Sequence, residues 1–286
     1  MKMVKINQLI KQTRENWGEN PDNLAIEVWL AECVGKDKTY LFINGEIEVD
    51  GEVEQRYWQG VNRLMAGEPL AQLIGYKEFY GIKFQVNADV LIPRPESELL
   101  VDLSRKFIQE NCQNLAEIRV IDVGTGSGCI LLSLAVVENQ VKGLGLEISE
   151  EALKVARTNL EFLKIEERVN LKKSDLLQEA ADFPADIILA NLPYIGTEKF
   201  NFVANDVEKY EPAVALFGGS DGLDLYRKMF DQLQKFPWKP RLMIGEFGFG
   251  QAEIMETVLK EKFPEAIAME IINDLAGIPR VFVLKW

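Results

Sequence analysis

The sequence of 286 residues contains no histidine. Imidazole is the usual general base at neutral pH and a frequent metal ligand, so its absence excludes Ser–His and Cys–His nucleophile pairs and all His–metal sites. Cysteine is also scarce, because only Cys33, Cys112 and Cys129 occur, at wide spacing. An odd and scattered set of this kind predicts neither a disulfide framework nor a zinc site. We therefore expect a protein of the reducing cytoplasm whose chemistry proceeds without imidazole and without a metal.

Long apolar runs and clusters of basic residues are missing as well. The apolar stretch 129–137 is among the longest, and it is far shorter than the roughly 20 residues that cross a bilayer. The first residues lack the continuous apolar segment of a signal peptide. Lysine and arginine number 32 against 45 aspartate and glutamate residues, which gives a net charge of −13. Nucleic-acid binding normally depends on basic residues that displace counterions, so we expect neither a membrane nor a direct nucleic-acid substrate.

Apolar residues recur at helical spacing through the first 75 or so residues. Two stripes carry this pattern: Ile26, Trp29, Leu30 and Cys33 form the first, and Val53, Tyr57, Val61 and Leu64 form the second. Residues 81–86 then alternate polar and apolar side chains, as the strands of a β-hairpin do. The sequence therefore predicts an N-terminal helical segment that is followed by a hairpin.

From about Arg119 onward, short strand-like segments alternate with helical ones. We expect strands at 119–123, 142–148, 168–173, 186–190, 241–247, 269–273 and 280–286. Ser149 can cap the helix that follows the second of these strands. This alternation predicts an α/β fold with a parallel, doubly wound sheet and helices on both faces. The last two strands have no helix between them, so we expect them to form a hairpin at one edge.

A glycine-rich loop follows the first of these strands, in the stretch VIDVGTGSGC. Glycines at this place let the backbone turn tightly and approach a ligand closely. The spacing is not that of the dinucleotide fingerprint, because Cys129 stands where the third glycine is expected, and no phosphate-loop lysine follows. A Gly-x-Gly-x-Gly loop after Asp122 resembles the first motif of S-adenosylmethionine-dependent methyltransferases. The residues expected to bind this cofactor are Gly124, Thr125, Gly126, Ser127 and Gly128.

Two further segments are candidates for holding the nucleoside of the cofactor. Glu147 ends the second strand, where a carboxylate can accept both ribose hydroxyls. Asp175 and Leu176 follow the third strand, where the carboxylate could hold the adenine amino group and the leucine could cover the ring. The alternatives are a solvated glutamate at the first place and an ordinary Ser-Asp turn at the second.

The stretch ADIILANLPY ends a buried strand with an amide, a proline and a phenol. A planar NH₂ group needs acceptors in the plane of its two hydrogens. The side chain of Asn191 and the main-chain carbonyl of Leu192 or Pro193 can provide them, and Tyr194 can stack on the flat group. Pro193 fixes φ and so holds the loop in place. The alternative is an Asn-x-Pro turn with a core tyrosine. If the loop is functional, Asn191 also adjoins the cofactor.

The whole chain resembles the HemK/PrmC family of protein-(glutamine-N5) methyltransferases that act on peptide chain release factors. The segments that carry this resemblance are 67–86, 90–102, 122–128, 191–195, 211–227, 245–251 and 273–286. Three positions depart from the family's common pattern. Leu192 replaces a proline, Ser97 stands where threonine is frequent, and Glu147 stands in place of the usual aspartate.

The resemblance implies a seven-stranded, Rossmann-like class I methyltransferase domain at 91–286, a β-hairpin linker at 76–90 and a helical substrate-docking domain at 1–75. It implies a cytoplasmic enzyme, which we expect to be a monomer. The reaction would transfer a methyl group from S-adenosylmethionine, leaving S-adenosylhomocysteine, to the glutamine of the Gly-Gly-Gln motif in class I release factors. Asn191, Pro193 and Tyr194 would be catalytic, and they would bind the substrate together with Leu192.

Two other functions are compatible with parts of the sequence. A nucleic-acid adenine-N6 methyltransferase uses a similar asparagine loop, but a basic groove and a target-recognition module are expected for it. A non-catalytic binding protein on a methyltransferase scaffold is expected to lose Asn191 or the glycine loop, and both are present.

Overall fold

The computed structural model describes residues 3–17 and 23–286 of the chain. The backbone divides into two compact units, Met1–Gly75 and Tyr76–Trp286. Within the described residues, no helix combines the length and the apolar character that crossing a membrane would require.

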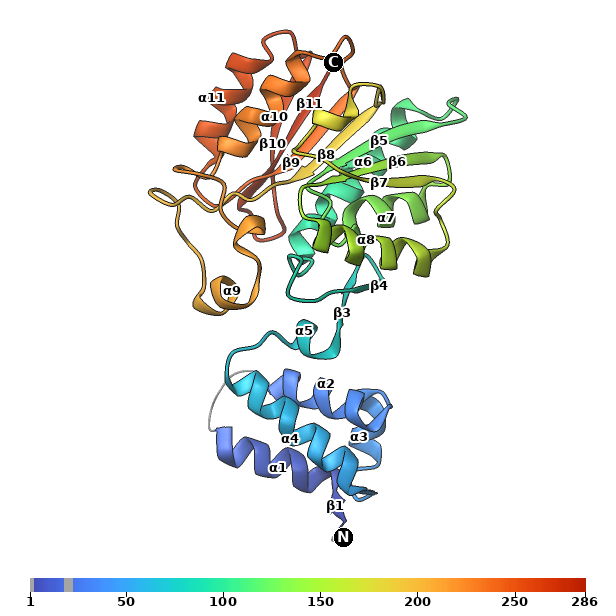
Figure 1. Cartoon of the computed structure of the whole chain (residues 1–286), viewed down its shortest axis with the longest axis vertical. Helices are drawn as coiled ribbons and strands as arrows, with labels where there is room; N and C mark the ends of the chain where they lie inside the picture. The colour runs from blue at the N-terminus through green and yellow to red at the C-terminus, as the bar shows by residue number, and fades with distance from the viewer. Residues whose placement is uncertain (1–2, 18–22) are drawn as a thin grey trace. The chain divides into compact units, whose positions relative to one another are not determined.

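The first unit is a small bundle of helices, as the two apolar stripes predict (Figure 1). Its helices are α1 (Ile6–Trp17), α2 (Asn23–Val34), α3 (Lys38–Ile43), α4 (Gly51–Met65) and α5 (Leu70–Ile74). The side chains of Trp29 and Tyr57 are buried between α2 and α4, where the Trp29 indole N–H donates to the Tyr57 carbonyl at 2.9 Å. One feature differs from the expectation of helices alone. Strands β1 (Val4–Lys5) and β2 (Glu48–Val49) form a short antiparallel pair, and two residues each are too few for a sequence alternation.

The second unit is built on a seven-stranded sheet, and the predicted fold class is confirmed. Its strands run in the spatial order β10-β11-β9-β8-β5-β6-β7. The elements from the N-terminal side are β3 (Tyr76–Phe79), β4 (Ile82–Gln85), α6 (Glu98–Asn111), β5 (Ile118–Val123), α7 (Cys129–Val137), β6 (Val141–Glu147), α8 (Glu150–Leu163), β7 (Val169–Lys173), β8 (Ile187–Asn191), α9 (Asn205–Tyr210), α10 (Asp224–Gln234), β9 (Leu242–Glu246), α11 (Ala252–Lys262), β10 (Ala268–Asn273) and β11 (Pro279–Lys285). Strands β5 to β9 are parallel, whereas β11 is antiparallel to both β9 and β10. The expected hairpin at one edge is therefore present.

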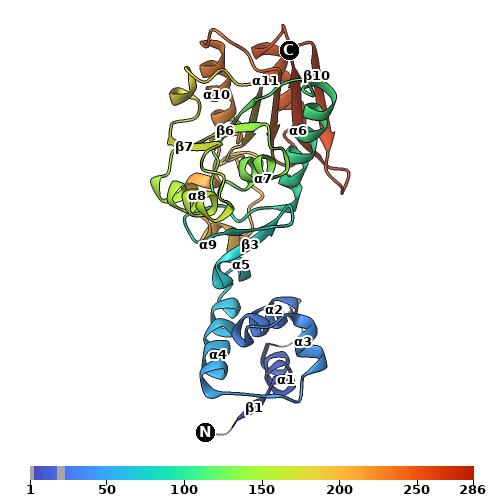
Figure 2. The same ribbon diagram turned by 90° about the vertical axis from the view of Figure 1, so that its right-hand side faces the viewer.

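Helices cover both faces of this sheet, and each face has its own apolar core. Leu100 of α6 and Leu131 of α7 pack on one face, together with Val120 of β5. Phe230 of α10 and Leu259 of α11 belong to the core of the other face. Figure 2 shows α6 and α10 on opposite sides of the strands. The open parallel sheet brings the carboxyl ends of β5, β6 and β8 to one edge, where ligands bind in folds of this kind.

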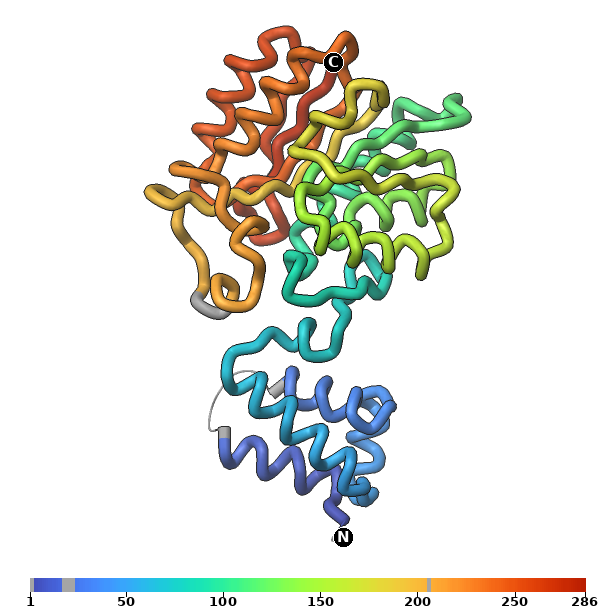
Figure 3. Tube along the Cα trace, in the orientation of Figure 1, coloured from blue at the N-terminus to red at the C-terminus, as the bar shows by residue number. Residues whose placement is uncertain are grey.

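The hairpin of β3 and β4 packs within the second unit. Phe79 and Phe84 join the core under α6, with their rings edge-on at 6.3 Å between centroids. The buried Asn159 of α8 ties this hairpin to the glycine loop, because its side chain bonds the backbone of Gln85 and donates to the Ser127 carbonyl at 2.9 Å. Between β8 and α10 the chain makes a long excursion that includes α9 (Figure 3).

Candidate functional site

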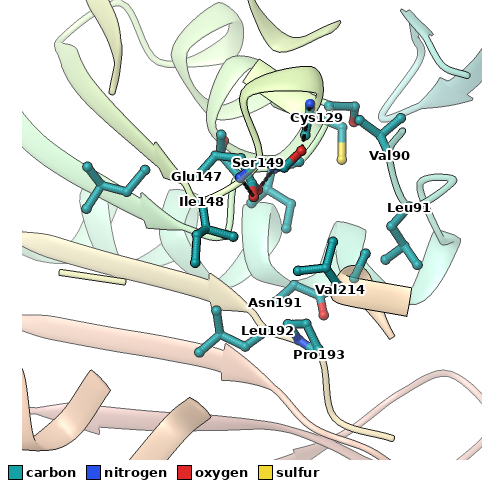
Figure 4. A pocket seen from close by; sticks show the side chains of 18 of the residues that line it. Val90, Leu91, Cys129, Glu147, Ile148, Ser149, Asn191, Leu192, Pro193 and Val214 are labelled. Atoms are coloured by element: carbon teal, nitrogen blue, oxygen red, sulfur yellow. Dashed lines mark hydrogen bonds between the residues drawn. The ribbon is translucent and has the colours of Figure 1, made fainter. Parts of the chain in front are cut away.

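A large cavity lies at the carboxyl ends of β5, β6 and β8 (Figure 4). It encloses about 1030 Å³, including the part that is open to solvent. Most of the residues predicted from sequence line it: Gly124, Thr125, Gly126, Ser127, Glu147, Asp175, Leu176, Asn191, Leu192 and Pro193. Two predicted residues do not, Gly128 and Tyr194. The topology of the sheet therefore gathers segments that are far apart in the sequence around one ligand-sized space.

The glycine loop is held against the end of β6. The backbone N–H groups of Gly124 and Thr125 both donate to the Leu146 carbonyl, at 2.8 and 2.9 Å. Gly126 has φ of 55°, and a β-carbon added there would meet only the Gly124 carbonyl oxygen, at 4.0 Å. A side chain at this position would consequently project into the open cavity. Gly128 serves packing instead, since a β-carbon there would come within 2.8 Å of Leu132.

The carboxylate of Glu147 is oriented by two backbone N–H groups. Gly126 donates to its Oε2 at 3.0 Å, and Ser149 donates to its Oε1 at 2.9 Å. Figure 4 shows this carboxylate beside the glycine loop at the edge of the cavity. Each carboxylate oxygen can accept more than one hydrogen bond, so Glu147 retains acceptor capacity for a hydroxyl pair.

Asp175 lies in the wall of the cavity with a partner that the sequence did not indicate. Its Oδ2 pairs with Nζ of Lys228 on α10, at 2.5 Å. Gln232 of the same helix donates to the Asp175 carbonyl, at 3.2 Å. The adjacent Leu176 is mostly buried and has φ of 56°, an uncommon backbone conformation for leucine. Helix α10 thus fixes the segment that was predicted to face the adenine.

Asn191 ends β8, and its side chain is fixed by residues that were not predicted as site residues. Its Nδ2 donates to Ser97 Oγ at 2.8 Å and to Glu246 Oε2 at 3.0 Å. Ser97 and Glu246 lie within the segments 90–102 and 245–251 that carry the family resemblance, but nothing in their spacing singles them out. Glu246 is 1% exposed, and this burial raises the pKa of its carboxyl.

Tyr194 lines a second cavity, which adjoins the first. Its hydroxyl donates to Glu246 Oε1 at 3.1 Å, and burial followed by the nearby carboxylate charge raises the pKa of the phenol. The second cavity has a volume of about 970 Å³, including the part that is open to solvent. The two cavities share Leu91, Arg94, Asn191, Leu192, Pro193 and Ala215 in their walls. The asparagine loop is therefore the place where the two spaces meet.

The segment 216–222 supports the outer side of this loop. Ile195 donates its N–H to the Leu216 carbonyl, and Gly218 donates back to the Ile195 carbonyl, each at 2.9 Å. A β-carbon at Gly218 would lie 2.2 Å from the Pro193 carbonyl oxygen, so only glycine permits this approach. The buried Gln251 adds a hydrogen bond of 2.7 Å from its Nε2 to the Tyr194 carbonyl.

The residues around the first cavity fit S-adenosylmethionine. The open space over Gly126 admits an extended chain next to the backbone, as the methionine part requires. The Glu147 carboxylate suits the ribose hydroxyls, while the largely apolar remainder of the wall includes Leu176 and Val214. No group of histidine, cysteine, aspartate or glutamate side chains suited to holding a metal ion occurs in the described part of the chain.

Comparisons with known proteins identify the family of the chain. Residues 6–75 match the family described as PrmC N-terminal domain, and residues 97–209 match the family described as Methyltransferase small domain. The release factor glutamine methyltransferase of Bacillus cereus is 33% identical over 267 residues, covering 91% of each protein. That of Clostridium acetobutylicum is 31% identical and covers 98% of this chain and 95% of the relative.

Among solved structures, the N-terminal domain of human METTL16 is similar, with a TM-score of 0.56 and coverage of 96% of each chain. Its sequence identity is 15%, so this likeness concerns the fold alone. The two family matches and the full-length alignments with named relatives agree with one another. The chain belongs to the release factor glutamine methyltransferase family and is an S-adenosylmethionine-dependent methyltransferase.

Proposed function

We propose that this enzyme methylates the side-chain amide nitrogen, N5, of the glutamine in the Gly-Gly-Gln motif of class I peptide chain release factors. The observation that carries the proposal is the orientation of Asn191 where the two cavities meet. Its Nδ2 is engaged by Ser97 and Glu246, so its carbonyl oxygen Oδ1 is the atom left to accept a hydrogen bond from a ligand. An acceptor at this place suits the NH₂ group of a carboxamide.

The main task of the protein in this reaction is to align the amide nitrogen with the methyl group of the cofactor. A carboxamide nitrogen is a poor nucleophile because its lone pair is delocalised into the carbonyl. Bound S-adenosylmethionine supplies a methyl group that is already activated on a sulfonium. Asn191 Oδ1 and the carbonyl of Leu192 or Pro193 would accept the two amide hydrogens and stabilise the positive charge that grows on nitrogen. Tyr194 would stack on the flat amide, and the proton would leave to water after transfer.

The two adjoining cavities support separate places for the cofactor and the substrate. The first cavity is lined by most of the residues that we expect to bind the cofactor, and the second is lined by Tyr194 and the rings of Phe200, Phe202 and Phe249, which would face the incoming substrate loop. A glutamine between two glycines can enter such a space because no neighbouring side chain obstructs it. The net charge of −13 is unfavourable for a nucleic-acid backbone.

The first unit is proposed to dock the release factor. Residues 6–75 match a family domain of their own, and they form a separate core. Docking energy that is remote from the reacting atoms can help to position the amide. A short Gly-Gly-Gln peptide should consequently react poorly. Deletion of residues 1–75 should reduce activity on the intact factor much more than activity on the peptide. We also propose that the enzyme acts as a monomer in the cytoplasm.

Mass spectrometry of a release factor incubated with enzyme and S-adenosylmethionine tests the proposal. The peptide that contains the Gly-Gly-Gln motif should gain the mass of one methyl group, located on the glutamine. A factor with alanine in place of that glutamine is the control and should stay unmodified. An unmodified glutamine together with labelled RNA or DNA would overturn the proposal in favour of adenine methylation.

A further inference from the structure

We propose that Glu246 is a positioning residue that locks the Asn191 amide with Oδ1 facing the substrate, and that its charge makes the site select a carboxamide over a carboxylate. The inference rests on the proposed function and concerns the same site. Glu246 ends β9 directly beside Asn191, since the two residues are register partners at the ends of neighbouring strands. Its carboxylate therefore lies within hydrogen-bonding distance of the Asn191 side chain.

Three hydrogen bonds define the lock. Ser97 Oγ donates to Glu246 Oε2 at 2.6 Å, while Asn191 Nδ2 donates to the same Oε2 at 3.0 Å and to Ser97 Oγ at 2.8 Å. Both amide hydrogens of Asn191 are thus used inside the protein. Turning the amide over would place Oδ1 against a carboxylate oxygen and against a serine whose single hydrogen is already given away. Only one orientation is compatible with this arrangement.

Glu246 also holds the other end of the loop. Its Oε1 accepts from the Tyr194 hydroxyl at 3.1 Å, so one carboxylate fixes both the amide and the aromatic ring that were predicted to contact the substrate. The Tyr226 hydroxyl binds the backbone carbonyls of Ala190 and Glu246 and so joins the ends of β8 and β9. The distance between the two strand ends, and with it the geometry of the lock, is therefore well defined.

Ser97, Asn191 and Tyr194 all donate to the Glu246 carboxylate, and these hydrogen bonds favour its ionised form against the effect of burial. The charge of this carboxylate adds selectivity. The side chain is 1% exposed, so its interactions are weakly screened by solvent. A substrate NH₂ group would meet the Asn191 oxygen with a carboxylate behind it, which favours the donor and the positive charge that grows on nitrogen. A substrate carboxylate would be repelled by the Asn191 oxygen and by the Glu246 carboxylate. The two arginines that line the second cavity are themselves paired, Arg94 with Glu211 and Arg280 with Asp274, and this limits any attraction they could offer.

The first experiment compares Glu246→Gln and Glu246→Leu with the wild-type enzyme on an intact release factor. Glutamine keeps one acceptor oxygen, whereas leucine fills similar space without any. We expect kcat to fall on the order of 100-fold for Glu246→Leu and clearly less for Glu246→Gln. The Kd for S-adenosylmethionine, measured by calorimetry, should stay unchanged in both. Ser97→Ala should lower kcat, while Ser104→Ala, at a buried serine whose hydroxyl donates to the Leu100 carbonyl of its own helix, should not.

A kcat near that of the wild type in the leucine variant would mean that Glu246 only fills space, and would overturn the inference. A lost affinity for S-adenosylmethionine in a folded Glu246→Gln variant would overturn it as well. If the leucine variant does not fold, Ser97→Ala and Glu246→Gln decide the same question. A wild-type enzyme that leaves the release factor unmodified would instead contradict the proposed function.

The second experiment measures selectivity by inhibition. Two unreactive release factors carry glutamate or leucine in place of the target glutamine. The wild-type enzyme should be inhibited more weakly by the glutamate factor than by the leucine factor. Glu246→Gln should narrow this difference, because it removes the buried charge. Equal inhibition of the wild-type enzyme by both factors, or an unchanged difference in the variant, would overturn the selectivity.

Discussion

The backbone N–H of Gly126 donates to Oε2 of Glu147 at 3.0 Å, and this bond ties the glycine loop after β5 to the acidic side chain that ends β6. The two segments that were assigned to the cofactor from sequence alone are therefore in direct contact. Glu147 therefore helps to hold the glycine loop in the position in which both segments would contact the cofactor. Loss of either residue should affect affinity for S-adenosylmethionine before it affects the chemistry.

Glu147→Ala should weaken S-adenosylmethionine binding by about 1.5–3 kcal/mol, the usual contribution of hydrogen bonds to a charged group. Glu147→Gln should lose less, because the carboxamide retains an acceptor. Calorimetry measures both. Glu150→Ala serves as the control, since Glu150 pairs with Arg157 on the surface of α8 and does not line the cavity. Equal affinities for all three variants and the wild type would remove Glu147 from the cofactor site.

Gly126→Val should abolish most cofactor binding, because the side chain would project into the cavity. The matched control is Gly277→Val in the turn between β10 and β11. Gly277 has φ of 79° and nothing within 4 Å of an added β-carbon, so it imposes a similar backbone strain outside the site. Thermal unfolding should show similar losses for both variants, and only the first should lose S-adenosylmethionine affinity. Similar affinities in the two would contradict the assignment.

Asn191→Ala should lower kcat on the order of 100- to 1,000-fold, the usual effect of removing one group that stabilises a developing charge. Asn191→Asp should be at least as damaging, since its second oxygen would face the Glu246 carboxylate in place of the amide hydrogens. Steady-state kinetics on a release factor, with calorimetry to confirm cofactor binding, measure both. A kcat near that of the wild type in the alanine variant would return Asn191 to a turn residue.

The pairing of Asp175 with Lys228 allows the adenine assignment to be tested from both sides. Asp175→Ala should weaken S-adenosylmethionine binding by about 1.5–3 kcal/mol if its carboxylate holds the adenine amino group. Lys228→Gln leaves the carboxylate in place, so we expect little change in affinity. Calorimetry of the two variants shows whether Asp175 binds the adenine or only supports the loop through its pair with Lys228. Equal losses would indicate that the pair supports the loop without contacting the cofactor.

Asp122 should make the free energy of unfolding depend on pH. Burial, only partly offset by the hydrogen bond from Thr125, raises the pKa of its carboxyl from 3.8 to about 7. The folded protein therefore binds this proton more tightly than the unfolded chain, and stability falls as pH rises from about 4 to about 7. The loss should reach roughly 4 kcal/mol above this range.

Asp122→Asn removes the titration while keeping the shape of the side chain. The free energies of unfolding of the wild type and the variant are measured with urea across this pH range. As pH rises, the wild type should lose stability relative to the variant. The contribution of all other groups cancels in that difference. Parallel curves would show that Asp122 keeps the same protonation state in the folded and unfolded protein.

The sequence alone was sufficient for the features that depend on local spacing. The order of strands and helices from Ile118 onward follows from apolar periodicity, because each element must bury one face. The glycine loop and the asparagine loop are contiguous motifs, so their residues identify them without knowledge of the fold. Their meeting at one sheet edge follows from parallel strands, whose carboxyl ends all point the same way.

Only the tertiary structure revealed the partners of these motifs. Glu246 and Ser97 are 149 positions apart, and Asp175 and Lys228 are 53 apart, so no spacing rule connects either pair. Glu246 reads as one more strand-end residue in the sequence, and it becomes the support of Asn191 because β9 lies beside β8 in register. A sequence specifies which residues are neighbours along a strand, whereas the packing of strands and helices decides which buried donors and acceptors must satisfy one another.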